Sequence, residues 1–429
     1  MMRCTGPVAG LLANRRRRES QPFLKACGKV HVLQPEAIAQ AWEAGREFRG
    51  AVMLSGAKHP GISWNAEIVR RPWAPQDDAG MSICGKFTRD TVQMSEQAKQ
   101  LFDLTKALVN IESITGNEKA CGEFLADYLD KQGFEISRQQ VEPGRSNVFA
   151  TLGRPDVVLS THMDTVPPFI PAGEDDEWLY GRGSCDAKGI LASQVIAAQG
   201  LKAEGVRDFA MLFMVGEEIL SDGAQKANEQ PPDVKYIING EPTENKLAVG
   251  TKGILRIDIK TSGKSAHSAY PEMGESAILK LLDILDEIRR IPLPEDPVMG
   301  PATVNIGVIR GGTAINVIPD SASAQILFRT VSATHELRER VEAVVKGRCE
   351  YEFVRDTRPI RTEHFDGFET EVVSYSTDLP SLTRWGRPLL LGPGSIRVAH
   401  TDHERVRKSD LTKAVELYTR LVKELKKRI

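Results

Sequence analysis

The sequence predicts an α/β protein whose mostly parallel sheet is covered by helices on both faces. After residue 94, helical and strand patterns alternate along the chain. The strand patterns at 156–164 and 208–218 are nearly continuous apolar runs, which is typical of strands buried on both faces. Polar clusters follow these runs directly, and open parallel sheets place their ligand sites at such strand ends.

A second pattern begins near Gly250. The segments 251–263, 302–312 and 321–331 alternate apolar and polar residues, as strands with one solvent-facing side do, and the segment 275–291 is an amphipathic helix. They predict a small antiparallel sheet packed against helices. The expected organisation is a first domain formed by 94–249 and 361–429, with a second, α+β domain inserted at 250–360.

Residues 1–93 have a different character, with an arginine run at 15–18 and little periodicity. Three interpretations stay open: a disordered extension, a targeting segment, or upstream sequence read from a start codon placed too early. We favour the last, because Met94 directly precedes a helical pattern for which Ser95 is a good N-cap.

Composition limits the function classes. A length of 429 residues suits two domains, and a net charge of -2 gives no general attraction to nucleic acid or anionic membranes. Six scattered cysteines without a C-x-x-C pair argue against a disulfide scaffold and a zinc knuckle. No apolar run approaches the roughly 20 residues that span a bilayer. We therefore expect a cytoplasmic protein whose partner is a small molecule.

Two polar clusters suggest metal ligands. In the first, His162 is followed by Asp164, so an imidazole could bind a metal while the carboxylate orients the ring. Alone, this pair is better read as a surface feature. In the second, G-R-G-S-C-D (181–186), glycines permit an unusual turn and Asp186 could bridge two cations. The cluster matches no phosphate-binding loop. Cys185 lacks an evident histidine partner and is read as a small buried residue.

Two further clusters carry carboxylates at strand ends. Glu217 and Glu218 follow the apolar run DFAMLFMV, where two acids are costly unless one binds metal and the other carries a proton. A solvated helix N-terminus is an equal alternative for this pair alone. Glu241 follows the next apolar run, in N-G-E-P-T (239–243).

The order of these motifs, followed by Gly392-Pro393-Gly394 and Ala399-His400-Thr401, resembles the family of acetylornithine deacetylase, succinyl-diaminopimelate desuccinylase, aminoacylase and glutamate-releasing carboxypeptidases. The resemblance covers 94–429 and implies a zinc exopeptidase-like catalytic domain. It implies one metal held by His162, Asp186 and Glu241, and a second held by Asp186, Glu218 and His400. It further implies Glu217 as the general acid and base, with Asp164 behind His162.

Nitrogen and oxygen ligands without thiolate suit two Zn²⁺ ions, with Co²⁺ or Mn²⁺ as substitutes. In the hypothesis, Glu217 removes a proton from water and passes it to the leaving amine. His403 lies close to His400 in the sequence and is an alternative ligand, but the A-H-T context favours His400.

The inserted domain is expected to contribute to the site. Gly263–Ser268 resembles a family segment whose histidine stabilises the oxyanion in a partner subunit, which implies a homodimer and a role for His267. The alternative is that His267 is a loop histidine beside a strand, without a catalytic role. Residues 311–319 and Arg329 resemble positions that meet a substrate carboxylate, so Asn316, Arg329 and Gly394 are candidate substrate-binding residues. A structural ion pair is the alternative for Arg329.

The predicted function is metal-dependent hydrolysis of an amide bond in N-acyl amino acids, of the acetylornithine deacetylase or succinyl-diaminopimelate desuccinylase kind. A dipeptidase or carboxypeptidase would use the same ligands on a peptide bond. A catalytically silent binding protein is a third class, which would be marked by loss of a ligand or of the base. This chain retains all of them.

Overall fold

The computed structural model describes residues 89–429, with side chains from Glu96 onward. The expectations for the leader therefore lie outside the described residues, apart from its last few positions. There, helix α2 (Arg89–Val109) begins before Met94, so Ser95 lies inside the helix and is not its N-cap. Residues 89–429 form one compact unit, and the finer division into domains stays a prediction.

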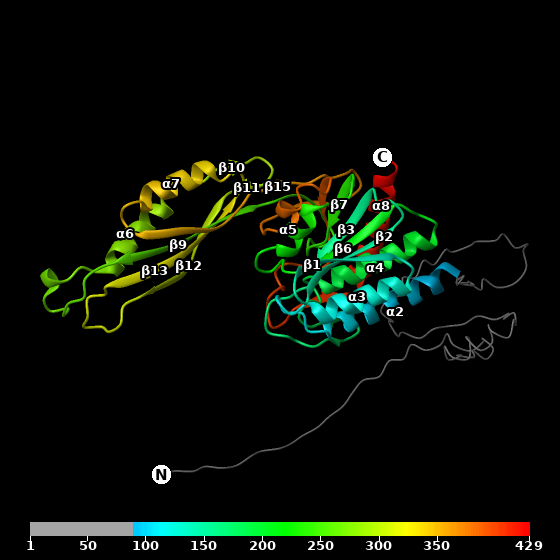
Figure 1. Cartoon of the computed structure of the whole chain (residues 1–429), viewed down its shortest axis with the longest axis horizontal. Helices are drawn as coiled ribbons and strands as arrows, with labels where there is room; N and C mark the ends of the chain where they lie inside the picture. The colour runs from blue at the N-terminus through cyan, green and yellow to red at the C-terminus, as the bar shows by residue number, and fades with distance from the viewer. Residues whose placement is uncertain (1–88) are drawn as a thin grey trace, which may run out of the picture. The chain divides into compact units, whose positions relative to one another are not determined.

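The larger described sheet is mostly parallel, as predicted. Its strand order is β1-β2-β6-β3-β7-β17, and β6, β3, β7 and β17 run parallel (Figure 1). The bounds are β1 (Glu135–Glu142), β2 (Arg145–Leu152), β3 (Val157–His162), β6 (Phe209–Met214), β7 (Tyr236–Asn239) and β17 (Arg387–Leu390). The hairpin β1–β2 adds an antiparallel edge that the apolar runs did not indicate.

Helical segments cover both faces of this sheet. On β6, Phe209, Met211 and Phe213 join the core that contains α2, α3 (Lys119–Lys131), α4 (Lys188–Ala203) and α8 (Lys408–Lys426). The alternate residues Ala210, Leu212 and Met214 join a second core with α5 (Asp222–Glu229) and η2 (Leu379–Ser381). Because successive strand residues point to opposite faces, a strand that feeds two cores must be apolar throughout.

The topology brings the polar clusters to one edge of the sheet. His162 is the last residue of β3, and the Glu217–Glu218 pair, Glu241 and the segment containing His400 follow β6, β7 and β17 respectively. Parallel strands have their carboxyl ends at the same edge, so these residues converge although they lie far apart in the sequence. Asp186 joins them from the turn that precedes α4.

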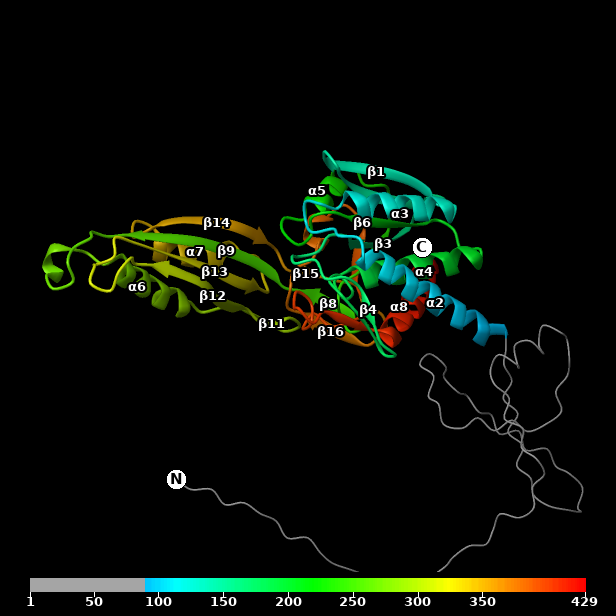
Figure 2. The same cartoon turned by 90° about the horizontal axis from the view of Figure 1, so that it is seen from below.

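A second sheet lies in the inserted part of the chain, with the antiparallel order β12-β13-β9-β14 (Figure 2). Its strands are β9 (Gly253–Ser262), β12 (Thr303–Gly311), β13 (Ser321–Thr330) and β14 (Glu350–Thr357). The inward residues of β9, such as Leu255 and Ile257, share a core with α6 (Ala277–Arg289) and α7 (His335–Val345). This is the expected antiparallel sheet layered on helices.

Short strands complete the described fold. β8 (Leu247–Thr251) pairs with β15 (Ile360–Arg361) and β16 (Thr370–Val373), and β5 (Trp178–Tyr180) pairs with β4 (Gly173–Glu174) and β18 (Arg405–Arg407). β10 (Glu295–Asp296) pairs with β11 (Gly300–Pro301). Within 89–429, no helix has both the length and the apolar character needed to cross a bilayer.

Candidate metal centre

Asp186 lies between two imidazoles. Its Oδ1 is 3.2 Å from Nε2 of His162, and its Oδ2 is 3.5 Å from Nε2 of His400. The same His400 nitrogen is 2.9 Å from Oε2 of Glu218, so His400 reaches the carboxylates from the segment after β17. One atom from each of His162, Asp186 and Glu218 fits within a 4.8 Å group. The two oxygens of Asp186 are thus arranged to serve two neighbouring cations.

Glu241 is a buried carboxylate at the same strand edge, with an exposed fraction of 3%. Among the described residues, its Oε1 has no hydrogen-bond partner. Burial, together with the nearby Glu217 and Asp186 carboxylates, raises the pKa of Glu241 well above its usual value. An unpaired buried carboxylate is costly unless a cation or a proton neutralises it. Glu241 therefore fits a metal-ligand position.

The charges of the cluster also favour cations. Burial disfavours a charged His162, yet the adjacent Asp164 and Asp186 still raise its pKa well above the usual value. Hydrogen bonds to Asp186 and Glu218 raise the pKa of His400 to about 10. The carboxylates thus favour positive charge at this position. Bound divalent cations would provide that charge and leave the two histidines unprotonated. Oxygen and nitrogen donors without thiolate match Zn²⁺, Co²⁺ or Mn²⁺.

Asp164 lies behind the His162 ring. Its Oδ1 is 3.4 Å from His162 Nδ1, and it accepts a hydrogen bond from the Thr115 hydroxyl at 2.8 Å. Its two oxygens also accept the backbone N–H groups of Glu217 and Glu218, each at 3.2 Å. His162 Nδ1 also lies 3.0 Å from the backbone carbonyl of Asp164, so Asp164 orients the imidazole through its backbone as well as its side chain. Its carboxylate in addition holds the backbone of the Glu217–Glu218 pair.

Glu217 has the environment of a proton acceptor. Burial raises its pKa well above the usual value, and the carboxylates of Asp378, Glu218 and Asp186 act in the same direction. A carboxylate with a raised pKa holds a proton more readily than an ordinary carboxylate does, which suits a group that accepts and returns one. Glu217 thus combines a place beside the ligands with the proton affinity that a general base requires.

The turn that carries Asp186 is closely packed. Gly181 and Gly183 adopt φ values of +121° and +88°, a region that favours glycine. Cys185 is fully buried in this turn, as predicted, and burial raises the pKa of its thiol well above the usual value. A Cβ on Gly394 would lie 2.6 Å from Cys185 Sγ, so the glycine permits the two segments to touch.

The structure adds a buried acid that no sequence motif marks. Asp378 has an exposed fraction of 0%, and neither of its oxygens has a hydrogen-bond partner in the described part of the chain. Burial and the charge of Asp164 raise its pKa to about 7. Glu404 also lies outside every sequence motif, whereas Arg182 lies within the G-R-G-S-C-D motif but was given no role.

The candidate residues of the inserted part form a separate group. His267 forms a β-bridge with Val317, and the backbone N–H of Ser268 donates to the Asn316 carbonyl at 3.0 Å. In the described residues, no hydrogen bond joins these loops to the His162–His400 cluster. The roles of His267, Asn316, Arg329 and Gly394 stay predictions. His403 is exposed, and its backbone N–H donates a hydrogen bond to the Thr401 hydroxyl.

Sequence comparisons give a consistent family. Residues 158–424 match the model of peptidase family M20/M25/M40. A peptidase M20 domain-containing protein of Schizosaccharomyces pombe is 39% identical over 335 residues, covering 75% of this chain and 84% of that protein. A probable carboxypeptidase of Aspergillus niger is 36% identical, covering 76% of this chain and 89% of that protein.

Solved structures share the fold. A tripeptidase of Staphylococcus aureus aligns with a TM-score of 0.65 and 22% identity, covering 76% of this chain and 99% of that one. A Bacillus subtilis protein described as a dinuclear metal-binding peptidase from the M20 family aligns with a TM-score of 0.56 and 16% identity, covering 77% and 99%. With the motifs, the fold and the carboxylate–imidazole cluster in agreement, the chain belongs to peptidase family M20/M25/M40, and it is a metal-dependent hydrolase of amide or peptide bonds.

Proposed function

We propose that this protein is a two-metal exopeptidase that hydrolyses the amide bond to a terminal amino acid with a free carboxylate. The observation that carries the proposal is the position of Asp186, whose oxygens face His162 and His400 separately. The naming of relatives such as the Aspergillus niger protein as probable carboxypeptidases favours a peptide over other amides.

The assigned ligands are His162, Asp186 and Glu241 for one cation, and Asp186, Glu218 and His400 for the other. When bound, two divalent cations would lower the pKa of water and polarise the substrate carbonyl. Glu217 takes the proton of the attacking water and transfers it to the leaving amine. Asp164 keeps Glu217 and His162 in place through its hydrogen bonds during both steps.

Arg329 is the candidate for the substrate carboxylate. It is half-buried on β13, and burial followed by the nearby Arg355 guanidinium lowers its pKa. No carboxylate among the described residues acts on it. A half-buried guanidinium without an anionic partner suits a ligand carboxylate, which it can bind with two parallel hydrogen bonds.

Deacylation of N-acyl amino acids is the second candidate function. Such substrates have the same terminal carboxylate and differ only in the acyl group on the amide. The order of motifs resembles the acetylornithine deacetylase group, which keeps this activity in the proposal. The acyl pocket, and not the ligand set, separates the two reactions.

The test uses the full chain loaded with Zn²⁺ or Co²⁺ and follows amine release from three substrate sets: dipeptides and tripeptides, their C-terminal amides, and N-acetyl or N-succinyl amino acids. We expect cleavage of free-carboxylate peptides, loss of cleavage with chelator, and at least about tenfold slower cleavage of the amides. Preferred cleavage of the N-acyl set would support the second candidate. Equal cleavage of peptide acids and amides would contradict carboxylate recognition.

A homodimer and a role for His267 in the partner subunit belong to the same proposal, as does a cytoplasmic location. Mixing the variants Glu217→Ala and His267→Ala tests whether His267 acts in the partner subunit. If it does, each variant alone is inactive, but a mixed dimer contains one site with an intact Glu217 and an intact His267. We expect partial recovery of activity and a dimer in sedimentation. A monomer whose His267→Ala variant is fully active would contradict this part.

A further inference from the structure

We propose that Arg182 and Glu404 form a reciprocal clamp that positions Asp186 and His400 for the second cation. Arg182 and Glu404 are positioning residues, and the inference rests on the proposed two-metal function. Arg182 belongs to the turn that carries Asp186, and Glu404 follows His400 on its loop. Arg182 contacts the loop of His400, and Glu404 contacts the turn of Asp186.

Glu404 holds the Asp186 turn. Its Oε1 accepts the backbone N–H groups of Gly183 at 2.8 Å, Cys185 at 3.2 Å and Asp186 at 3.1 Å. The Asp186 N–H belongs to a ligand residue itself. A single carboxylate oxygen therefore fixes the backbone of that ligand with respect to the His400 loop.

Arg182 holds the His400 loop. Its Nη1 donates to Oε2 of Glu404 at 2.6 Å and to the carbonyl of Thr401 at 3.2 Å. Thr401 is the residue directly after His400. In addition, Nε of Arg182 donates to the Pro168 carbonyl at 3.3 Å, which fixes the guanidinium from a third segment.

Both members of the clamp are buried, with side-chain exposures of 2% for Arg182 and 0% for Glu404. His400 differs from the other ligands, since its side chain is 48% exposed whereas that of Glu218 is 5% exposed. His400 also adopts a φ of +64°, which is uncommon for a residue with a side chain. Packing therefore restrains the His400 side chain less than those of the other candidate ligands. The clamp instead holds the backbone next to His400, through the hydrogen bond from Arg182 to the Thr401 carbonyl.

The chemistry of the clamp requires a carboxylate at position 404. Its two oxygens meet only donors: three N–H groups on one side and a guanidinium on the other. A glutamine amide would place its NH₂ group against either the turn or Arg182, where donor would face donor. Glu404→Gln therefore preserves shape while it breaks one half of the clamp. Arg182→Lys preserves the charge but lacks the separate nitrogens with which Nη1 reaches Glu404 and Thr401 while Nε reaches the Pro168 carbonyl.

The competing explanation is that this buried pair only stabilises the fold. Glu118 offers a matched control. Its carboxylate also has 0% side-chain exposure, and it is not one of the candidate metal ligands. It accepts two hydrogen bonds from Arg145, at 2.8 Å each. Glu118→Gln should lower the melting temperature without altering metal binding, whereas the clamp variants should alter both.

The experiment titrates the metal-free full chain and each variant with Zn²⁺ by calorimetry, and records the visible absorption of the Co²⁺ form. Wild type and Glu118→Gln should bind two ions. Glu404→Gln and Arg182→Lys should bind the second ion about 10- to 100-fold more weakly, the range for residues that orient metal ligands. Excess Zn²⁺ should restore the second ion, because all ligands remain present.

The outcomes separate the two proposals. Two ions bound with wild-type affinity by both folded clamp variants would overturn the clamp and leave the two-metal function intact. A single ion in the wild type would overturn the two-metal function and the clamp with it. Loss of the second ion in Glu118→Gln as well would also overturn the clamp, because general destabilisation would then explain the effect.

Discussion

The Asp164 carboxylate accepts the backbone N–H of Glu217 at 3.2 Å. It also lies against Nδ1 of His162, so the residue that orients a candidate ligand fixes the candidate base as well. The geometry links metal binding to proton transfer through one buried residue, whose backbone carbonyl also lies 3.0 Å from His162 Nδ1.

Replacement of Asp164 by alanine should therefore impair both functions. We expect about 10- to 100-fold weaker metal binding and a loss of turnover at saturating metal that is at least as large. Calorimetric metal titration and kcat measurements test this. Asp103→Asn, at a side chain with 57% exposure, is the control and should resemble the wild type. Normal turnover of Asp164→Ala at saturating metal would show that Asp164 is not needed to position Glu217 for proton transfer.

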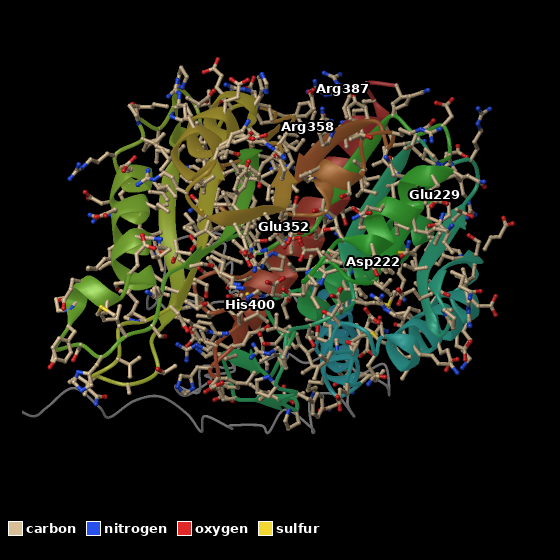
Figure 3. The ribbon with its side chains drawn as sticks, turned by 60° about the vertical axis from the view of Figure 1, so that its left-hand side comes forward. Asp222, Glu229, Glu352, Arg358, Arg387 and His400 are labelled. Carbon is tan, nitrogen blue, oxygen red and sulfur yellow. The ribbon has the colours of Figure 1, made fainter. Side chains whose placement is uncertain are left out.

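Replacement of Glu217 by glutamine or alanine should leave two metals bound and lower kcat by about 10²- to 10⁴-fold, since a positioned general base contributes about that much. Metal analysis and initial rates measure the two effects separately. Glu229→Gln provides the control, because that side chain is 59% exposed on α5 (Figure 3). A Glu217 variant with near-normal turnover would remove this residue from the proton-transfer role.

His400→Ala should bind one metal in place of two, whereas His403→Ala should bind two. The physical reason is that His400 Nε2 lies 2.9 Å from Glu218 and 3.5 Å from Asp186, while the side chain of His403 is exposed. Metal counting after gel filtration tests the pair. The opposite result would assign the ligand to His403.

Metal binding should release protons near pH 7. Without metal, hydrogen bonds to Asp186 and Glu218 raise the pKa of His400 to about 10, so its imidazole is protonated at neutral pH. A cation must displace that proton, and apparent affinity should therefore increase as pH rises from about 6 toward 10. Calorimetry in two buffers of different ionisation enthalpy counts the protons. His400→Ala should release fewer, and an affinity independent of pH would contradict the prediction.

Asp378→Asn should change how the stability of the metal-free protein depends on pH. Burial raises the pKa of Asp378 from 3.8 to about 7, so the folded state binds the proton more tightly than the unfolded state. This stabilisation is complete below pH 3.8 and is lost as pH rises through about 7. A tenfold difference in proton affinity between the two states corresponds to about 1.4 kcal/mol of stability, which urea unfolding can measure.

The asparagine variant should therefore be the more stable protein at pH 8 and should show a flatter profile between pH 4 and 7. An Asp103→Asn variant at the exposed α2 position is the matched control. Parallel profiles for wild type and Asp378→Asn would show that Asp378 keeps an ordinary pKa.

Local pattern was sufficient for most elements of the fold. The run that became β6 is apolar at every position, and β3 begins with three apolar residues, because each strand faces two cores. The alternating segments that became β9 and β13 face one core only. The start of α2 at Arg89 was missed, because a good N-cap at Ser95 describes only local preference and helix formation is cooperative along the chain. The antiparallel edge β1–β2 was missed because β1, EISRQQVE, has few apolar residues and no continuous apolar run.

The sequence by itself determined the fold class and the candidate ligands, because strand periodicity and the motifs at strand ends are local features. Only the tertiary structure showed that Asp186 faces two imidazoles and that Arg182 pairs with Glu404. It also showed that the buried Asp378 side chain has no hydrogen-bond partner within residues 89–429. These relations join segments up to 222 residues apart. Such contacts form only when distant segments are buried together, and the packing of the whole sheet against its helices decides which segments those are.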